Sequence, residues 1–158
     1  DELNIPSWII KWLRLKFLKH AGTSKENLPK KIYIDRGDSR YQTRRILNNN
    51  EVKNFLEKKG FSTLRLTNYS FIDQIKLFNS AENVVGLHGG GFANMIFCKP
   101  STNILELRTK YTGKIIENLA IKSNLNFNTI ELEPENIEAL DQQGHVHVDI
   151  KELEKKIS

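Results

Sequence analysis

Short apolar runs and amphipathic helical patterns alternate along this chain, with a new apolar run about every twenty residues. The runs that we predict to be strands are residues 31–34, 61–66, 83–87, 104–107 and 127–132. Strands that are apolar at successive positions are typical of a parallel sheet buried on both faces. The alternation therefore predicts an α/β fold, a Rossmann-like parallel sheet with right-handed crossovers and helices on both faces.

Helical patterns fill the intervals between these predicted strands. Asn48 followed by Glu51 is a capping pattern that predicts a helix start, and this helix ends before Gly60. Ser70 followed by Asp73 predicts a second start. We expect further helices over residues 91–98, 114–124 and 149–157.

The first part of the chain, residues 1–30, is interpreted as a unit of its own, a helix over residues 7–20 followed by a polar linker. Both tryptophans, Trp8 and Trp12, lie on this helix, and its apolar residues are spread almost all round it. We interpret the helix as packing on a partner domain or on the back of this one, with contact to a membrane surface as the alternative. Residues 31–158 form the second unit, the Rossmann-like domain.

Three successive glycines, Gly89, Gly90 and Gly91, follow the third predicted strand and precede a helical segment. Without side chains, main-chain N–H groups can approach an anion closely, and the helix N-terminus adds partial positive charge. The turn lacks the lysine and hydroxyl residue of a Walker loop, and it does not follow the first strand as a dinucleotide fingerprint would. The pattern indicates a site for a nucleotide or a sugar phosphate, and tight packing of the turn is the structural alternative.

Four arginines, Arg36, Arg40, Arg44 and Arg45, follow the first predicted strand. Parallel strands end at the same edge of a sheet, so this loop and the glycine turn are expected to lie at one edge. Guanidinium groups match phosphate oxygens with paired hydrogen bonds. We predict that these arginines bind a diphosphate, and the alternative is a solvated basic loop.

Three more polar residues near the glycine turn are candidates for the same site. His88 could donate to a phosphate oxygen or act as an acid or base, so it is the one residue considered for catalysis. Asn94, in the first turn of the following helix, is expected to close over the phosphate. Glu106 interrupts an apolar run, and a buried carboxylate needs partners. We expect it either to accept hydrogen bonds from ribose hydroxyls or to pair with Arg108 or Lys110.

The net charge of +5 is unevenly distributed, which narrows the range of partners. Residues 1–50 contain eleven Lys/Arg and five Asp/Glu, whereas residues 131–158 contain three and eight. A basic front half suits nucleic acid, an anionic membrane or a phosphorylated small molecule. Few aromatic residues lie among the basic ones, which argues against single-stranded nucleic acid. His145 and His147 are too few to form a metal site, so we assign no metal.

Five segments follow one another in an order that is more specific than any one of them. They read IYIDR from residue 32, RRILN from 44, FIDQ from 71, VVGLHGGGFAN from 84 and ILEL from 104. In this order the chain resembles the glycosyltransferase 61 family over about residues 31–108. Members of that family usually read His-Gly-Ala-Gly-Leu-Thr-Asn at the glycine turn, so Gly90, Phe92 and Ala93 depart from the pattern. Ala93 lacks the hydroxyl that the family's threonine offers to a phosphate.

The resemblance implies an inverting, metal-independent transferase of the two-domain GT-B type. Such an enzyme moves a sugar from a nucleotide diphosphate, usually a UDP-sugar, to a glycan or polysaccharide acceptor, with no cofactor besides the donor. The resemblance assigns this chain to the carboxy-terminal, nucleotide-sugar-binding half, so an amino-terminal acceptor domain would lie outside it.

By analogy within the family, the setting is synthesis of bacterial envelope or capsule polysaccharide. The compartment is then the cytoplasm, at the inner face of the membrane, or the secretory lumen for a eukaryotic relative. We expect no nucleic-acid partner. The competing interpretation is a non-enzymatic basic module that binds nucleic acid or an anionic membrane surface.

Overall fold

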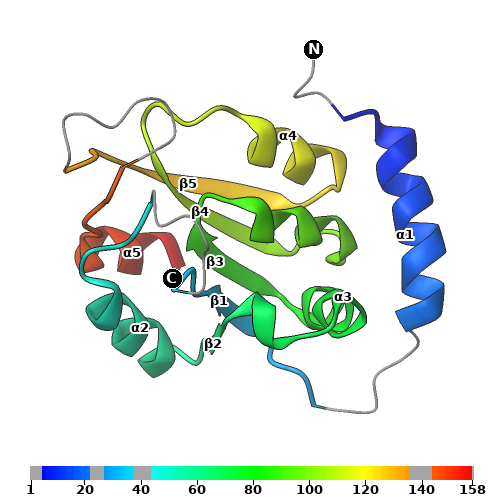
Figure 1. The fold of residues 1–158 in the computed structure, drawn as a ribbon, viewed down its shortest axis with the longest axis horizontal. Coiled ribbons are helices and arrows are strands. Elements are labelled where there is room, and N and C mark those ends of the chain that lie inside the picture. Colours follow the sequence, from blue (N-terminus) through cyan, green and yellow to red (C-terminus); the bar gives the residue numbers. More distant parts are fainter. Residues whose placement is uncertain (1–4, 22–26, 38–43, 136–143, 158) are drawn as a thin grey trace.

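One sheet of five parallel strands forms the centre of the structure, in the order β2-β1-β3-β4-β5 (Figure 1). The computed structural model describes residues 5–21, 27–37, 44–135 and 144–157. The strands are β1 (Lys31–Ile34), β2 (Ser62–Leu64), β3 (Asn83–Leu87), β4 (Asn103–Thr109) and β5 (Asn126–Leu132). Every pairing between neighbouring strands is parallel, which confirms the predicted α/β, Rossmann-like sheet.

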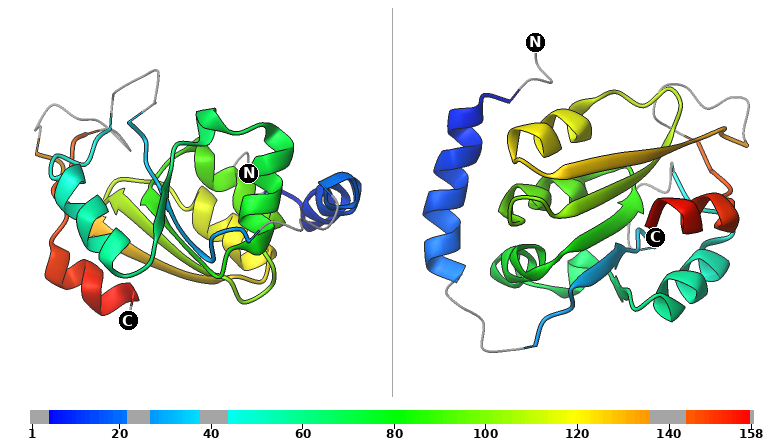
Figure 2. Two further views of the ribbon diagram at one scale, coloured as in Figure 1. Left: turned by 90° about the horizontal axis from the view of Figure 1, so that it is seen from below. Right: turned by 180° about the vertical axis from the view of Figure 1, so that it is seen from behind.

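Helices cover both faces of this sheet (Figure 2, left). One face lies under α2 (Asn49–Lys58) and α5 (Ile150–Ile157). The other face lies under α3 (Phe71–Ser80), α4 (Ile115–Lys122) and the 3-10 helix η2 (Gly90–Phe97), and a short 3-10 helix, η1 (Leu66–Asn68), precedes α3. The first helix, α1 (Ser7–Ala21), packs outside α3 and η2. None of the helices in the described ranges is long and apolar enough to cross a membrane.

The side chains of β1 alternate between the two apolar cores. Ile32 and Ile34 lie in the core under α3 and η2, whereas Tyr33 lies in the core under α2 and α5. All three are at least 96% buried, with relative exposures of 0%, 4% and 1%. Burial of one such side chain contributes about 1.5–3 kcal/mol, so both faces of the strand stabilise the sheet. This explains why β1 is apolar at successive positions.

The two predicted helix caps have different outcomes. The Ser70 hydroxyl accepts a hydrogen bond of 3.2 Å from the Asp73 N–H, so the predicted cap of α3 is confirmed. The helix start predicted at Asn48 is confirmed, because Asn48 is the N-cap residue of α2, but its side chain makes no cap hydrogen bond to the main chain and Nδ2 donates to Glu51 Oε2 at 2.9 Å. The amide also accepts from the Val148 N–H at 3.0 Å and donates to the Val148 carbonyl at 2.9 Å. It therefore ties α2 to the segment that leads into α5.

The strand order places the switch point of the chain between β1 and β3. The chain passes from β1 outward to β2, returns to the other side of β1 as β3, and continues to β4 and β5. In doubly wound sheets, ligands bind at such a point, beyond the carboxyl ends of the strands. Ile34 at the end of β1 pairs in register with Gly86 of β3, so the residues that follow both strands emerge side by side.

Candidate functional site

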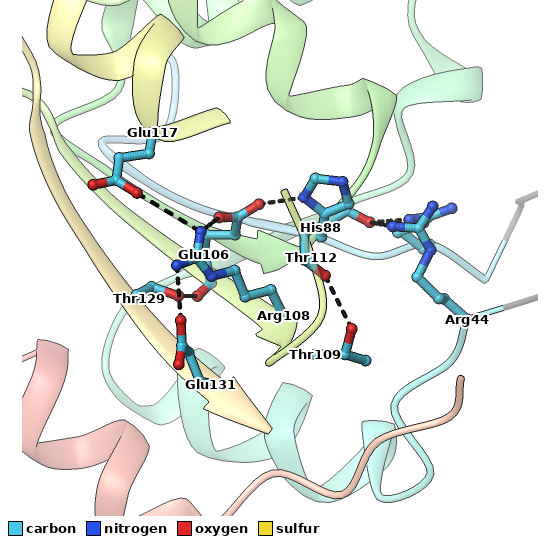
Figure 3. Close-up of polar contacts among 10 residues, drawn as sticks. Arg44, His88, Glu106, Arg108, Thr109, Thr112, Glu117, Thr129 and Glu131 are labelled. Atoms are coloured by element: carbon cyan, nitrogen blue, oxygen red, sulfur yellow. Dashed lines mark hydrogen bonds and ion pairs between the residues drawn. The ribbon is translucent and has the colours of Figure 1, made fainter. Parts of the chain in front are cut away.

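The carbonyl oxygen of His88 is the atom at which the exits of β1 and β3 meet. Arg36, which follows β1, donates a hydrogen bond from Nη1 to this oxygen. Nη1 of Arg44 lies 3.3 Å from the same oxygen (Figure 3). Two guanidinium groups therefore converge on one carbonyl, although their like charges repel each other. A concentration of positive charge at the switch point favours an anionic ligand.

Only glycine fits at position 89, because the Arg36 guanidinium lies too close to the main chain there for a side chain. A Cβ atom at position 89 would overlap the Arg36 guanidinium. Its φ angle of 162° is extended backbone that any residue adopts, so its conformation alone does not demand glycine. At Gly91 an added Cβ would lie 2.9 Å from Leu66 Cδ1, whereas at Gly90 it would meet nothing within 4 Å. Gly89 thus lets Arg36 lie against the main chain, and Gly90 leaves the turn open.

A pocket of about 60 Å³ lies beside these arginines, on the α2 side of the sheet. Its lining residues are Tyr33, Ile34, Asp35, Arg36, Gly37, Arg44, Arg45, Ile46, Asn49 and Leu87. Small-molecule sites usually have about 300–1,000 Å³, so this pocket has room for one charged group and not for a whole nucleotide. Arg45 is exposed, and its guanidinium has no hydrogen-bond or ion-pair partner among the described residues.

The positive charge of Arg44 lies in an unfavourable environment, because the guanidinium is partly buried and close to Arg36. Burial lowers the pKa of its guanidinium below the usual value, the neighbouring charge of Arg36 lowers it further, and Glu106 acts in the opposite direction. The Arg44 Nε–H is buried and has no hydrogen-bond partner in the part of the chain that the structure describes. An anion in the pocket would relieve the repulsion between the two arginines and could accept from this donor.

Asp35 fixes the chain between β1 and Arg36. Its carboxylate is almost fully buried and accepts hydrogen bonds from the Gly37 N–H at 3.1 Å and from Asn49 Nδ2 at 3.2 Å. It also accepts from Arg65 Nε at 3.1 Å and lies 3.7 Å from Lys53 Nζ. Burial alone raises the pKa of Asp35, but these hydrogen bonds and the charge of Lys53 outweigh it and hold the pKa below its usual value. Asp35 is therefore an ionised anchor for the loop that carries Arg36.

A chain of charged side chains continues from His88 across the other face of the sheet (Figure 3). His88 Nδ1 is hydrogen-bonded to Glu106 Oε1 at 2.5 Å. Glu106 Oε2 lies 3.5 Å from Nη1 of Arg108, whose Nη2 donates to Glu131 at 2.8 Å. Glu117 of α4 lies 3.9 Å from Arg108 Nη1. The imidazole at the glycine turn is thus held by a buried carboxylate that is itself held by an arginine.

The structure shows the internal pair with Arg108 that was one of the two expectations for Glu106. Glu106 lies in the middle of β4 and has 0% exposure, so its carboxylate does not reach the surface of the sheet edge. Its partners are His88 and Arg108, while Lys110 pairs with Glu133 at 2.8 Å. In this arrangement Glu106 contacts both the imidazole of His88 and the guanidinium of Arg108, and its expected contact with ribose hydroxyls stays a prediction.

The remaining candidates lie in different places. The Asn94 side chain points toward α3, because its Nδ2 donates to Gln74 Oε1 at 2.9 Å and lies 3.4 Å from the Gly91 carbonyl. It therefore fastens η2 to α3 and does not line the pocket beside the arginines. Arg40 lies outside the described residues.

Several residues of the site have no local sequence signal. Asp35 and Asn49 were not candidates, because the burial of a carboxylate after a strand and its partners on a later helix follow only from the fold. Arg108 was considered only as a partner of Glu106. Its contact with Glu131 follows from the register in which these two residues pair across β4 and β5.

The described ranges contain no group of three His, Cys, Asp or Glu side chains placed to bind a metal ion. Val146, which separates His145 from His147, bridges to Ile46 and Pro134, and both histidines belong to this connection.

Comparison with known proteins gives one finding. The family model described as Glycosyltransferase 61 matches residues 2–105. The matched region includes β1 to β3, the glycine turn and every lining residue of the arginine-lined pocket. No curated protein matches the chain.

Proposed function

This chain belongs to the glycosyltransferase 61 family, and from that premise we propose that the exits of β1 and β3 bind the diphosphate of a nucleotide-sugar donor. The observation that carries this proposal is the convergence of Arg36 and Arg44 on the His88 carbonyl at the switch point of the sheet. Arg45 lines the same pocket and adds a third guanidinium. A diphosphate is the part of such a donor that carries charge to match them.

The size of the pocket supports one phosphoryl group inside it and the rest of the donor along the sheet edge. The pocket of about 60 Å³ is too small for a nucleotide, and the glycine turn lies next to it. Gly90 presents main chain without a side chain, so it leaves room for the second phosphoryl group. Arg40 lies between Arg36 and Arg44 in the sequence, and we propose that it also binds the diphosphate.

The chemical role of these groups is stabilisation of the departing diphosphate. When the bond between sugar and diphosphate breaks, negative charge grows on the leaving oxygen, and fixed cations and N–H dipoles stabilise that charge. We propose that the four arginines of this loop supply this stabilisation without a metal ion or a further cofactor, as an inverting GT-B transferase would. The donor in this proposal is a UDP-sugar, and a second domain supplies the glycan acceptor site.

His88 is the candidate for direct contact with the donor, whereas Glu106 and Asn94 act through others. Glu106 orients the imidazole through its bond to Nδ1. Asn94 keeps η2, and with it the glycine turn, against α3. The base that deprotonates the acceptor is not assigned to any residue of this chain.

Titration calorimetry of the purified protein with UDP and UMP tests the proposal. We expect UDP to bind about tenfold more tightly than UMP, because a charge-assisted hydrogen bond contributes about 1.5–3 kcal/mol. Arg45→Ala should remove most of that difference, since Arg45 lines the pocket and its guanidinium has no hydrogen bond or ion pair to lose within the described part of the chain. Lys99→Ala, at an exposed lysine after η2, is the control. Equal affinities for UDP and UMP, or no effect of Arg45→Ala, would contradict the site.

A further inference from the structure

The outer side of α1 exposes a row of apolar side chains. Trp8, Trp12 and Leu15 are 68%, 55% and 77% exposed. Their spacing of four and three residues places them on one side of the helix. The opposite side is occupied, because Ile10 and Ala21 belong to the core under α3 and η2. We call Trp8, Trp12, Leu15 and the exposed lysines between and beside them, Lys11, Lys16 and Lys19, the α1 outer surface.

The charge of the α1 outer surface has one sign. Lys11, Lys16 and Lys19 are exposed, and the sequence of α1 contains no aspartate or glutamate. Arg14 does not contribute, because its guanidinium donates to the carbonyls of Ile96 and Cys98 and so fastens α1 to η2. The surface therefore combines bulky aromatic rings with ammonium groups that have no acidic neighbour on their own helix.

We propose that the α1 outer surface docks on an anionic lipid bilayer. Tryptophan rings favour the boundary between headgroups and acyl chains, and lysine side chains extend their apolar stems while their ammonium groups meet anionic headgroups. A protein partner fits less well, because lysine is depleted at protein interfaces and here lysines flank a single row of three apolar side chains. The positive charge of the α1 outer surface is complementary to anionic lipid headgroups, so it favours a membrane over a protein partner.

The docked helix would lie along the membrane surface. α1 has 15 residues, and its inner side remains packed on the protein. In all three views the strand arrows point away from α1 (Figures 1 and 2). Docking would therefore leave the exits of β1 and β3 turned toward water. This inference does not depend on what binds at those exits.

The fluorescence of the protein itself reports on this surface, because Trp8 and Trp12 are the two tryptophans of the chain. We expect vesicles that contain phosphatidylglycerol to shift the emission to shorter wavelength and to allow quenching by brominated lipid. Vesicles of phosphatidylcholine alone should give much smaller changes, and added salt should weaken binding because the attraction is electrostatic. Unchanged emission with phosphatidylglycerol vesicles would overturn the proposal.

Sedimentation with vesicles tests the same surface without relying on fluorescence. Trp8→Ala/Trp12→Ala and Lys11→Glu/Lys19→Glu should each reduce binding to phosphatidylglycerol vesicles about tenfold or more. The matched control is Lys58→Glu/Lys155→Glu, which makes the same charge change on α2 and α5 and should leave most of the binding. Circular dichroism checks that all variants are folded.

Two results of these experiments would contradict docking through α1. Equal losses in the Lys11/Lys19 and Lys58/Lys155 variants would show that net charge alone drives binding. A dimer in gel filtration that Trp8→Ala/Trp12→Ala converts to monomer would identify a second copy of the chain as the occupant. None of the three double variants changes a residue of the arginine-lined pocket, so UDP affinity should be unchanged in all of them, whichever result is obtained.

Discussion

Asp35 determines where Arg36 lies, although it contacts no ligand in the proposed site. Its carboxylate receives the Gly37 N–H and the side chains of Asn49 and Arg65, so the loop after β1 has one anchored position. Arg36 reaches the His88 carbonyl from that position. The direction of a binding side chain thus depends on a buried carboxylate one residue earlier.

Replacing Asp35 should produce a stability difference that depends on pH. The folded pKa of Asp35 is below its usual value of 3.8, so the carboxylate stabilises the fold above that value and loses this effect as the pH falls through the folded pKa. At neutral pH we expect Asp35→Asn to cost about 1–3 kcal/mol. Urea unfolding at neutral pH and in acid measures this. A difference from the wild type that stays constant down to strongly acidic pH would contradict an ionised Asp35.

Replacing Glu106 should lower the free energy of unfolding, because two buried side chains depend on its carboxylate. Glu106→Ala leaves Arg108 buried without one of its carboxylates and removes the acceptor at Nδ1 of His88, so we expect a loss of about 3 kcal/mol. Glu106→Gln keeps the shape and a hydrogen-bond acceptor and should lose less. Urea unfolding gives both values, and calorimetry at a temperature where each variant is folded gives UDP affinity. We expect Glu106→Ala to bind UDP about tenfold more weakly, and wild-type values for both variants would exclude the positioning role.

The sequence predicted the cations and the glycine turn of the site because residue type alone carries their chemistry. Arg36, Arg44, Arg45 and the turn at Gly89 do lie together. It could not predict that Glu106 would bond to His88 or that Asn94 would face α3, since both contacts depend on tertiary packing. Whether these residues bind a donor stays a prediction.

At the scale of elements, α1 is attached to the domain by a few specific contacts. Arg14 donates to the last carbonyls of η2, and Phe17 packs edge-on against Phe71 and Phe97 with centroids 5.3 and 6.3 Å apart. These contacts keep the helix in place although its outer side is open to solvent.

Arg14→Ala should loosen α1 without unfolding the sheet. Hydrogen bonds from a charged donor contribute about 1.5–3 kcal/mol, so we expect the protection of α1 amides against hydrogen exchange to fall by at least tenfold. Amides of β3 and β4 should keep their protection, since they lie in the centre of the sheet. For Arg14→Lys, which keeps one charged donor group, we expect the protection of α1 amides to lie between that of the wild type and that of Arg14→Ala. Equal loss across α1 and the central strands would mean that α1 is not a separable element.

Element boundaries were less predictable than element types. The predicted second strand, residues 61–66, is divided into β2 (Ser62–Leu64) and the 3-10 helix η1 (Leu66–Asn68). The fourth strand extends to Thr109, beyond the predicted apolar run, because Arg108 and Thr109 pair with Glu131 and Leu132 of β5. A polar residue can continue a strand when a neighbouring strand supplies its hydrogen bonds, and the local sequence does not show this.

For the whole molecule, the order of apolar runs was sufficient to predict a parallel sheet with helices on both faces. Each apolar run had to be buried on both faces of the sheet, and the helices predicted between the runs could pack on those faces. The strand order, with its switch point between β1 and β3, required the structure. That order explains why residues more than 40 positions apart, such as Arg44 and His88, meet at one atom.

Mapping of UDP-induced amide chemical-shift changes in the isotope-labelled protein tests the central claim most directly. The account predicts changes concentrated in residues 35–37, 44–46 and 88–91, which follow β1 and β3 or line the pocket between them. The opposite edge of the sheet has a hollow of about 220 Å³ lined by Asn83, Asn103 and Asn126, and it should not respond. Changes confined to that opposite edge, or none at saturating UDP, would contradict a diphosphate site at the carboxyl ends of the strands.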